Sequence, residues 1–251
     1  MIPAFLKGKL SKEQENLEDL LTSCVFGVLR YLPANDGLLR YLQLAQYPDG
    51  RMLLEHTLSL GTTKYDFWPW LQDDDCPGAE PDVLIQILDE AGKHYTLLVE
   101  AKFRSGKSSF ALEEAPVPVD QLAREWDNLL RLCAKSGSIP LMLYLTADTS
   151  IPKQDLSESA KEFTSKRPDL ADKQPFCCAW LSWRHLSDAF GKAQDLMQAD
   201  LVALVERLGL VFFRGVSLIT PRPISWSFDQ GISTFNFRIP SMSDFSWSFA
   251  K

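Results

Sequence analysis

Residues 78–107 read GAEPDVLIQILDEAGKHYTLLVEAKFRSGK, two apolar runs separated by a turn that contains glycine. Runs of this length and composition predict two strands, over 81–88 and 94–102, joined as a hairpin. Each strand has a carboxylate near the end away from the turn, Asp82 in the first and Glu100 in the second. Because burial of an isolated charge is unfavourable, these carboxylates indicate a function at that end of the hairpin.

The register of the hairpin decides whether the two carboxylates meet. A turn centred at 91–92 pairs residues whose numbers sum to about 182–183 in an antiparallel ladder. Asp82 is then expected opposite Glu100 or Ala101. Since side chains alternate along a strand, Glu100 and Lys102 are expected on the same face as Asp82.

Two acids and a lysine at one strand end have a chemical use. Adjacent buried carboxylates disfavour each other's ionisation unless a cation lies between them. Mg²⁺ or Mn²⁺ takes oxygen ligands, which Asp82, Glu100 and the carbonyl of Ala101 would supply together with water. Lys102 would position or activate a water, or stabilise charge that develops on phosphorus. The residue set therefore predicts phosphodiester hydrolysis.

The segments around the hairpin predict an α/β fold. Helical spacing of apolar residues predicts a helix over 11–32, and 52–60 is expected to be extended. An aromatic, Pro- and Asp-rich loop then leads to the hairpin. A second helix is expected over 119–133 with Asp120 as its cap, followed by a buried strand over 139–147. The order helix, three strands, helix, strand predicts a mixed β-sheet flanked by helices.

C-terminal additions are expected beyond this core. A charged helix or loop is predicted for 151–175, a strand for 176–186 and a helix for 187–209. We expect one domain over 1–210. An aromatic and Ser-rich extension over 211–251 is expected to pack on the domain or to dock a partner.

Pro81-Asp82 and Glu100-Ala101-Lys102, on the second and third of three predicted strands, resemble the PD-(D/E)xK nuclease superfamily. The resemblance covers about 11–147 and implies a restriction-endonuclease-like core. It implies metal-dependent cleavage of nucleic acid, with DNA the favoured substrate and RNA the alternative. It also implies a bacterial role in restriction, repair or defence against phage.

Two further positions match the family pattern. Many members have an acid on the first helix that completes the metal site, and Glu18 is the first candidate here, with Glu15 the second. Related nucleases place a glutamine at the start of the helix after the lysine strand, a position held by Gln121. The implied role of this glutamine is to orient the substrate or the lysine. Those nucleases tend to have a tyrosine four residues later, where this chain has Glu125, so the match does not assign a subfamily. A solvated helix face for the acid and a local hydrogen bond for the glutamine are the structural alternatives.

Three basic residues are candidate phosphate contacts. Arg104 and Lys107 follow the lysine strand, and Arg124 lies on the second predicted helix. A solvated loop is the alternative for the first two. The Gly-Lys-Ser at 106–108 resembles the end of a P-loop, but the upstream glycine position holds Ala101, so no nucleotide cofactor is expected.

Composition limits the partners of the chain. Its 251 residues contain 26 basic and 33 acidic side chains, a net charge of −7, so contact with nucleic acid needs a local basic patch, a metal ion or a partner. No apolar run approaches the roughly 20 residues that cross a bilayer, and a signal-peptide pattern is lacking. A cytoplasmic location without membrane attachment is expected. Five cysteines without paired spacing predict reduced, mostly buried thiols.

The acidic balance also favours a second hypothesis. The chain would keep the nuclease fold and act as a non-catalytic subunit or interaction module of a larger defence or repair complex. Under either hypothesis a protein partner or a homo-oligomer is expected, because no target-reading domain is recognisable. The aromatic residues of 65–70 (YDFWPW) lack interleaved basic residues, so a core or protein-docking role is expected for them in preference to base stacking.

Overall fold

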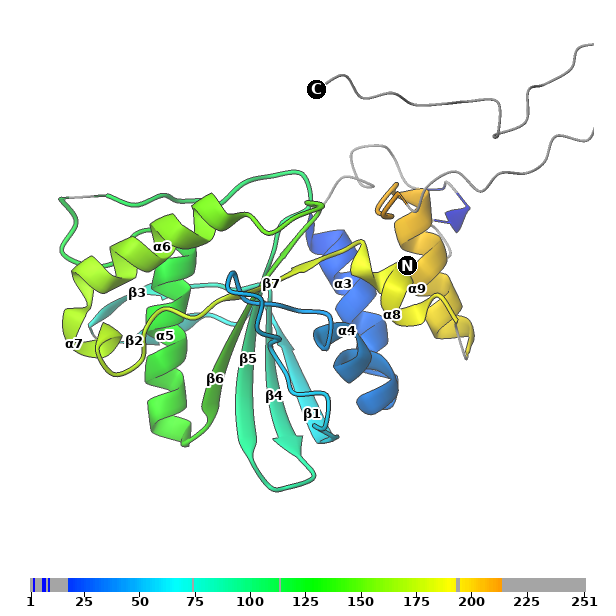
Figure 1. Ribbon diagram of the computed structural model, residues 1–251, viewed down its shortest axis with the longest axis horizontal. Helices are drawn as coiled ribbons and strands as arrows, with labels where there is room; N and C mark the ends of the chain where they lie inside the picture. Colours follow the sequence, from blue (N-terminus) through cyan, green and yellow to red (C-terminus); the bar gives the residue numbers. More distant parts are fainter. Residues whose placement is uncertain are drawn as a thin grey trace, which may run out of the picture. The chain divides into compact units, whose positions relative to one another are not determined.

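The chain folds as an α/β structure, a mixed five-stranded sheet with helices on both faces (Figure 1). This computed structural model describes residues 18–213 apart from 74, 113, 193 and 194, together with residues 2, 6, 7 and 9. The predicted α/β class with a mixed sheet flanked by helices is confirmed, and the restriction-endonuclease-like core stays a prediction. The described helices include none that is both long and apolar enough to cross a membrane.

The sheet combines antiparallel and parallel pairing. Its first three strands in spatial order are antiparallel to one another, and its last three are parallel. The strands in that order are β1 (Leu60–Phe67), β4 (Val83–Asp89), β5 (His94–Ala101), β6 (Ile139–Thr146) and β7 (Ala179–Ser182). A separate antiparallel pair is formed by β2 (Leu71–Asp73) and β3 (Cys76–Ala79).

Helices cover the two faces of the sheet in two groups (Figure 1). One group consists of α5 (Gln121–Ser136), α6 (Lys153–Lys166) and α7 (Pro168–Ala171). The other consists of α3 (Glu18–Leu29), the π-helix η1 (Asn35–Leu39), α4 (Arg40–Leu42), α8 (His185–Phe190) and α9 (Leu196–Arg207).

The predicted hairpin forms in the predicted register. Val83 pairs with Val99, so paired numbers sum to 182, and one further step places Asp82 opposite Glu100. Leu98 packs in the core under α5, whereas Val99 belongs to the core under α3. Even-numbered residues of β4 and β5 therefore face α5, as strand alternation requires.

Helix α5 begins after the predicted cap, Asp120, but continues to Ser136, past the predicted end at 133. The Oδ1 atom of Asp120 accepts a hydrogen bond from the N–H of Ala123 at 3.1 Å, which caps the first turn. Gly137 ends the helix with φ of +69°, a left-handed conformation that glycine adopts at little cost. The first residue after the cap is Gln121, so the cap also fixes where this side chain enters the site.

The first strand was misplaced by sequence. The stretch 52–59 is irregular, with turns, bends and one isolated bridge residue, and β1 instead occupies Leu60–Phe67. Leu53 and Leu54 are consecutive yet bury in the same core, which alternating strand side chains do not do. Strand β1 lies at the sheet edge with exposed polar residues, and this polarity resembled a loop.

Further boundaries differ at the C-terminal side. The helix expected over 187–209 is divided into α8 and α9, and Asp195 caps α9 by accepting from the N–H of Gln198 at 2.9 Å. Strand β7 is shorter than the predicted 176–186, because the imidazole of His185 accepts from the N–H of Ser182 at 3.1 Å and starts α8. The excursion after β6 is helical and forms α6 and α7. Residues 11–17 of the first predicted helix, and 214–251 of the extension, lie outside the described residues, so the domain boundary stays a prediction.

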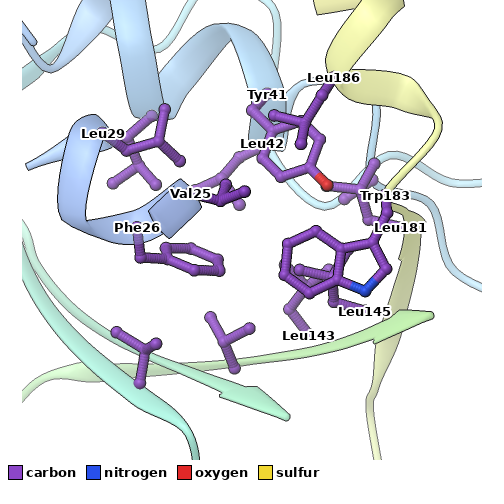
Figure 2. Close-up of a cluster of buried hydrophobic side chains, with 14 of the residues drawn as sticks. Val25, Phe26, Leu29, Tyr41, Leu42, Leu143, Leu145, Leu181, Trp183 and Leu186 are labelled. Carbon is purple, nitrogen blue, oxygen red and sulfur yellow. The ribbon is translucent and has the colours of Figure 1, made fainter. Parts of the chain in front are cut away.

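A large apolar core lies between the sheet and the helices on its α3 side (Figure 2). Trp183 is fully buried and packs edge-on against Phe26 at 6.4 Å between ring centroids. Its indole N–H donates to the carbonyl of Lys102 at 3.1 Å. Burial of a large apolar side chain is worth about 1.5–3 kcal/mol, so this core holds the backbone of the lysine firmly.

Candidate active site at the carboxyl end of strand β5

Asp82 lies at the start of β4, buried, opposite Glu100. Its Oδ2 atom accepts a hydrogen bond from the N–H of Ala101 at 2.8 Å. The N–H of Lys102 donates to Leu145 on β6, so the preceding N–H points the other way, toward β4. This local bond holds the Asp82 carboxylate against the end of β5.

Lys102 joins two carboxylates from distant parts of the chain. Its ammonium donates to Glu100 Oε1 at 2.6 Å and to Glu18 Oε1 at 3.0 Å. The Oε2 atom of Glu18 accepts from the N–H of Phe103 at 2.8 Å and from the hydroxyl of Ser105 at 2.7 Å. Glu18 starts α3, and its contacts tie that helix to the end of β5. Its role as a metal ligand stays a prediction, and the alternative residue, Glu15, lies outside the described part of the chain.

Gln121 is held at both ends of its amide. The Nε2 atom donates to Glu100 Oε1, and the Oε1 atom accepts from the N–H of Ser108 at 2.8 Å. The first residue of α5 is thereby linked to β5 and to the loop that follows it. The structure thus brings together Glu18, Asp82, Glu100, Lys102 and Gln121.

Glu125 belongs to this cluster and was missed by sequence reasoning, which noted it only as a departure from tyrosine. It is 1% exposed, and it lies within hydrogen-bonding reach of Glu100 and Gln121. Its Oε2 atom has no hydrogen-bond partner among the described residues. The available signal was its spacing, since residues four apart on a helix share a face.

Burial dominates the protonation of the acids. It raises the pKa of Asp82 to about 6, although the N–H of Ala101 and the ammonium of Lys102 oppose the shift. Burial, with the charge of Asp82, raises the pKa of Glu100 to about 7. The pKa of Glu125 lies well above its usual range because of burial and the charge of Glu100. Burial alone would lower the pKa of Lys102, but Glu100 and Glu18 outweigh it and raise that pKa, so the lysine is charged at neutral pH.

These shifts predict a pH-dependent stability. Between the ordinary carboxyl pKa near 4 and the raised values of about 6 for Asp82 and about 7 for Glu100, the folded chain binds more protons than the unfolded chain. The free energy of unfolding in EDTA is therefore expected to fall, by about 2–4 kcal/mol, as pH rises from 5 to 8. Urea denaturation across this range measures the fall. Asp82→Asn keeps an acceptor for the N–H of Ala101 and is expected to make the free energy of unfolding depend less on pH. An unchanged dependence would contradict the raised pKa of Asp82.

The donor set fits Mg²⁺ or Mn²⁺. Asp82, Glu100 and the carbonyl of Ala101, which points to the same side as its N–H, supply the hard oxygen donors that these ions prefer. Burial, more than the charge of neighbouring acids, raises the pKa values of Asp82 and Glu100, so a bound cation would favour their ionised forms. Within the described ranges, no three His, Cys, Asp or Glu side chains converge on one point. A carbonyl and waters would have to complete the coordination.

The three candidate phosphate contacts lie in different environments. Arg104 is exposed and lines a cleft of about 350 Å³ beside Lys102 and Ser105. Arg124 is half-buried on α5, and its substrate role stays a prediction. Lys107 is only 5% exposed and is turned into the protein, so it is corrected from a phosphate contact to a structural residue.

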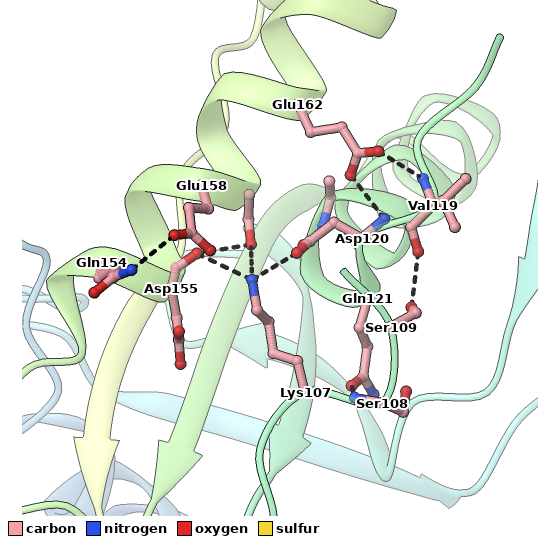
Figure 3. Close-up of polar contacts among 12 residues, drawn as sticks. Lys107, Ser108, Ser109, Val119, Asp120, Gln121, Gln154, Asp155, Glu158 and Glu162 are labelled. Atoms are coloured by element: carbon pink, nitrogen blue, oxygen red, sulfur yellow. Dashed lines mark hydrogen bonds and ion pairs between the residues drawn. The ribbon is translucent and has the colours of Figure 1, made fainter. Parts of the chain in front are cut away.

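Lys107 is the centre of a buried network between α5 and α6 (Figure 3). Its ammonium donates to Asp120 Oδ2 at 2.6 Å, to the hydroxyl of Ser159 at 3.3 Å and to the carbonyl of Asp155 at 3.4 Å. Glu162 of α6 accepts from the N–H of Asp120 at 2.7 Å. The network fixes the N-terminus of α5, which presents Gln121 to the site.

Comparisons with known proteins leave the site to be interpreted from its own geometry. No protein-family model, no curated protein and no solved structure matches the chain. The resemblance to PD-(D/E)xK nucleases therefore stays a prediction, carried by the residues at the ends of β4 and β5.

Proposed function

We propose that the chain is a metal-dependent nuclease of the PD-(D/E)xK type that hydrolyses phosphodiester bonds in DNA. The observation that carries the proposal is the convergence of two buried carboxylates and a charged lysine. Asp82 lies opposite Glu100, and the ammonium of Lys102 is 2.6 Å from Glu100 Oε1. A second buried acid beside an ion pair raises the pKa of both acids, and acids with raised pKa values concentrate at functional sites.

Each residue has a distinct task in the proposed reaction. When bound by Asp82, Glu100 and the Ala101 carbonyl, Mg²⁺ or Mn²⁺ would make water more acidic and stabilise negative charge on the phosphate. Lys102, held by two carboxylates, presents its ammonium to the attacking water or the phosphate oxygens. Gln121 fixes the Glu100 carboxylate through its amide N–H.

The cleft beside the lysine suits a phosphate-bearing substrate. It is about 350 Å³ in volume, and its charged lining residues are Lys102 and Arg104 together with Asp148 and Asp155. The side chain of Arg104 is exposed there. Guanidinium groups bind phosphate oxygens through paired N–H donors, so Arg104 is the substrate contact that we place nearest the reacting phosphate.

Calorimetry and cleavage assays together test this function. We expect purified protein to bind Mn²⁺ and to cut single-stranded or plasmid DNA in Mg²⁺ or Mn²⁺, with no cutting in EDTA. Gel electrophoresis of the products distinguishes cuts at ends from internal cuts. Absence of both Mn²⁺ binding and cleavage would overturn the proposal.

A second candidate function is a non-catalytic subunit with this fold. The observation that favours it is the position of Lys102, whose ammonium lies between Glu18 and Glu100 and balances charge without an added ion. This candidate predicts no Mn²⁺ binding together with a tight complex with the product of a neighbouring gene. Size-exclusion chromatography of the two proteins together separates it from the first.

The biological setting is part of the same proposal. All five cysteines are free thiols, and four of them are buried, as the sequence predicts. Free thiols suit the reducing cytoplasm, where we place the protein. A protein partner or a second copy would supply target recognition in restriction, repair or defence against phage, since the net charge of −7 gives little general attraction to DNA.

A further inference from the structure

Trp68 directly follows edge strand β1 and has an unusual backbone. Its φ is +50°, a left-handed conformation that is strained for a bulky side chain. Its N–H donates to the carbonyl of Asp82 at 3.0 Å, which extends the β1 and β4 pairing by one residue. Strain of this kind persists where surrounding contacts enforce it, and it concentrates at functional sites. Trp68 is therefore held beside a proposed metal ligand.

Trp68 and Tyr31 are 38% and 67% exposed, and Phe67 is partly buried against the apolar core. The rings of Trp68 and Phe67 are 5.7 Å apart. The guanidinium of Arg30, from the end of α3, lies 6.0 Å from the Phe67 ring and 4.6 Å from the Tyr31 ring. We call Tyr31, Arg30, Phe67 and Trp68 the stacking row. The folded chain thus supplies, from another element, the basic group that residues 65–70 lack in sequence.

A second tryptophan, Trp70, follows Trp68 by two residues in the sequence. Trp70 is 63% exposed, yet its indole N–H donates to Gln72 Oε1 at 3.0 Å. Its ring lies so close to Gly78 that a Cβ there would be 2.3 Å from ring atom Cζ2. Any residue larger than glycine at position 78 would displace the ring. Trp70 is thus a rigid aromatic surface with one side against β3 and much of the ring in solvent.

We propose that the stacking row and Trp70 bind an unpaired nucleic-acid strand and lead it to Asp82, which makes single-stranded DNA the substrate; this inference rests on the proposed nuclease function. Exposed rings stack on bases of any sequence when the bases are unpaired. In a duplex the base faces are covered by their neighbours, so the rings have nothing to stack on. A guanidinium between two rings suits the phosphates of such a strand.

Binding of a single strand by the stacking row needs little positive charge elsewhere on the chain. Stacking of a base on an aromatic side chain contributes about 1–3 kcal/mol, and this contribution does not depend on counterion release. A chain of net charge −7 can therefore bind single strands through a few rings and one arginine. Salt dependence is accordingly expected to be shallow.

Fluorescence anisotropy in EDTA, where cleavage is prevented, tests the inference. The probe is a labelled single-stranded DNA of about 15 nucleotides, long enough for a site of this kind. We expect its duplex, and an abasic strand of equal length, to bind at least about tenfold more weakly, because neither offers a free base face. Equal affinity for all three ligands would overturn the inference.

Substitutions assign the binding to the row. Trp68→Ala is expected to weaken single-strand binding by about tenfold, and Trp68→Phe, which keeps a ring, by much less. Leu196→Ala removes an apolar side chain that is 84% exposed on α9 and is expected to change nothing. Circular dichroism checks folding. If Trp68→Ala does not fold, Trp70→Ala and Arg30→Gln take its place, each expected to weaken binding about threefold to tenfold. Wild-type affinity in the folded variants would contradict the inference.

The nuclease proposal and the stacking-row proposal can be contradicted independently of each other. If Mn²⁺ supports no cleavage but single strands bind through Trp68, the nuclease proposal fails and the stacking row stands as a binding site. If single strands and duplex are cut equally and Trp68→Ala binds DNA like the wild type, the nuclease stands and the stacking row fails.

Discussion

Lys102→Met is expected to lower the rate of DNA cleavage by about a thousandfold while Mn²⁺ binding is retained. Removal of one positioned donor or proton-transfer group typically costs about a hundredfold to ten-thousandfold. Lys102 supplies no oxygen ligand, so its loss removes a chemical group and not a part of the metal site. Single-turnover cleavage at saturating Mn²⁺ measures the rate, and calorimetry measures the binding.

The effect of Mn²⁺ on the melting temperature is a second measurement on the Lys102→Met variant. Without the ammonium, Glu18 and Glu100 face each other with no cation between them. Loss of the ammonium removes a group that lowers the pKa of Glu100, so variant and wild type are compared at the same alkaline pH. Mn²⁺ then replaces the missing positive charge. We expect Mn²⁺ to raise the melting temperature of Lys102→Met by more than that of the wild type.

Asp82→Asn is the matched control for the lysine variant. It keeps the shape of the side chain and an acceptor for the N–H of Ala101, but it removes an anionic ligand. This variant is expected to lose both Mn²⁺ binding and cleavage. If Lys102→Met cuts DNA at the wild-type rate, or loses Mn²⁺ binding as Asp82→Asn does, the role assigned to the lysine is wrong.

Sequence predicts the centre of the site because strand geometry is local. The turn length sets the register, and alternation then decides which side chains share a face. These two rules place Asp82 opposite Glu100 or Ala101 and Lys102 on the face of Glu100, and the observed register selects Glu100. The same reasoning did not identify edge strand β1, because its exposed face is polar and a polar sequence of this kind is also typical of a loop.

Contacts between segments far apart in the sequence cannot be predicted from strand register and side-chain alternation. Resemblance to a family selects Glu18, but only the folded chain shows that its two oxygens bind Lys102 and the loop after β5. Lys107 lies in a polar loop, where exposure is the ordinary expectation. Its partners come from α5 and α6, and their convergence depends on how those helices pack.

Lys107→Met is expected to lower the free energy of unfolding by about 3–5 kcal/mol, the cost of leaving one member of a buried ion pair alone. Both side chains are enclosed, 1% exposed for Lys107 and fully buried for Asp120. Without the lysine, the Asp120 carboxylate stays buried, and the first-turn N–H of Ala123 is the one donor that remains to it among the described residues. Urea denaturation, with unchanged m-values, gives the difference in free energy.

Lys135→Met is the control, because Lys135 forms an ion pair with the same N–O distance as Lys107. Lys135 contacts Asp73 at 2.6 Å, as Lys107 contacts Asp120, but the Lys135 side chain is 71% exposed. An exposed pair contributes about 0–1 kcal/mol. Comparison of the two variants separates the effect of burial from the effect of contact distance. Equal losses of stability would show that burial of the Lys107 pair has no special weight.

The double variant Lys107→Met, Asp120→Asn decides whether uncompensated charge causes the loss. Asparagine keeps the capping oxygen for Ala123 but carries no charge. The double variant is therefore expected to recover at least half of the stability lost in Lys107→Met. Because this network anchors the first turn of α5 (Figure 3), recovery should also restore the position of Gln121 and, with it, cleavage. If the double variant is as unstable as the single one, lost packing of the lysine stem, and not its charge, holds α5 in place.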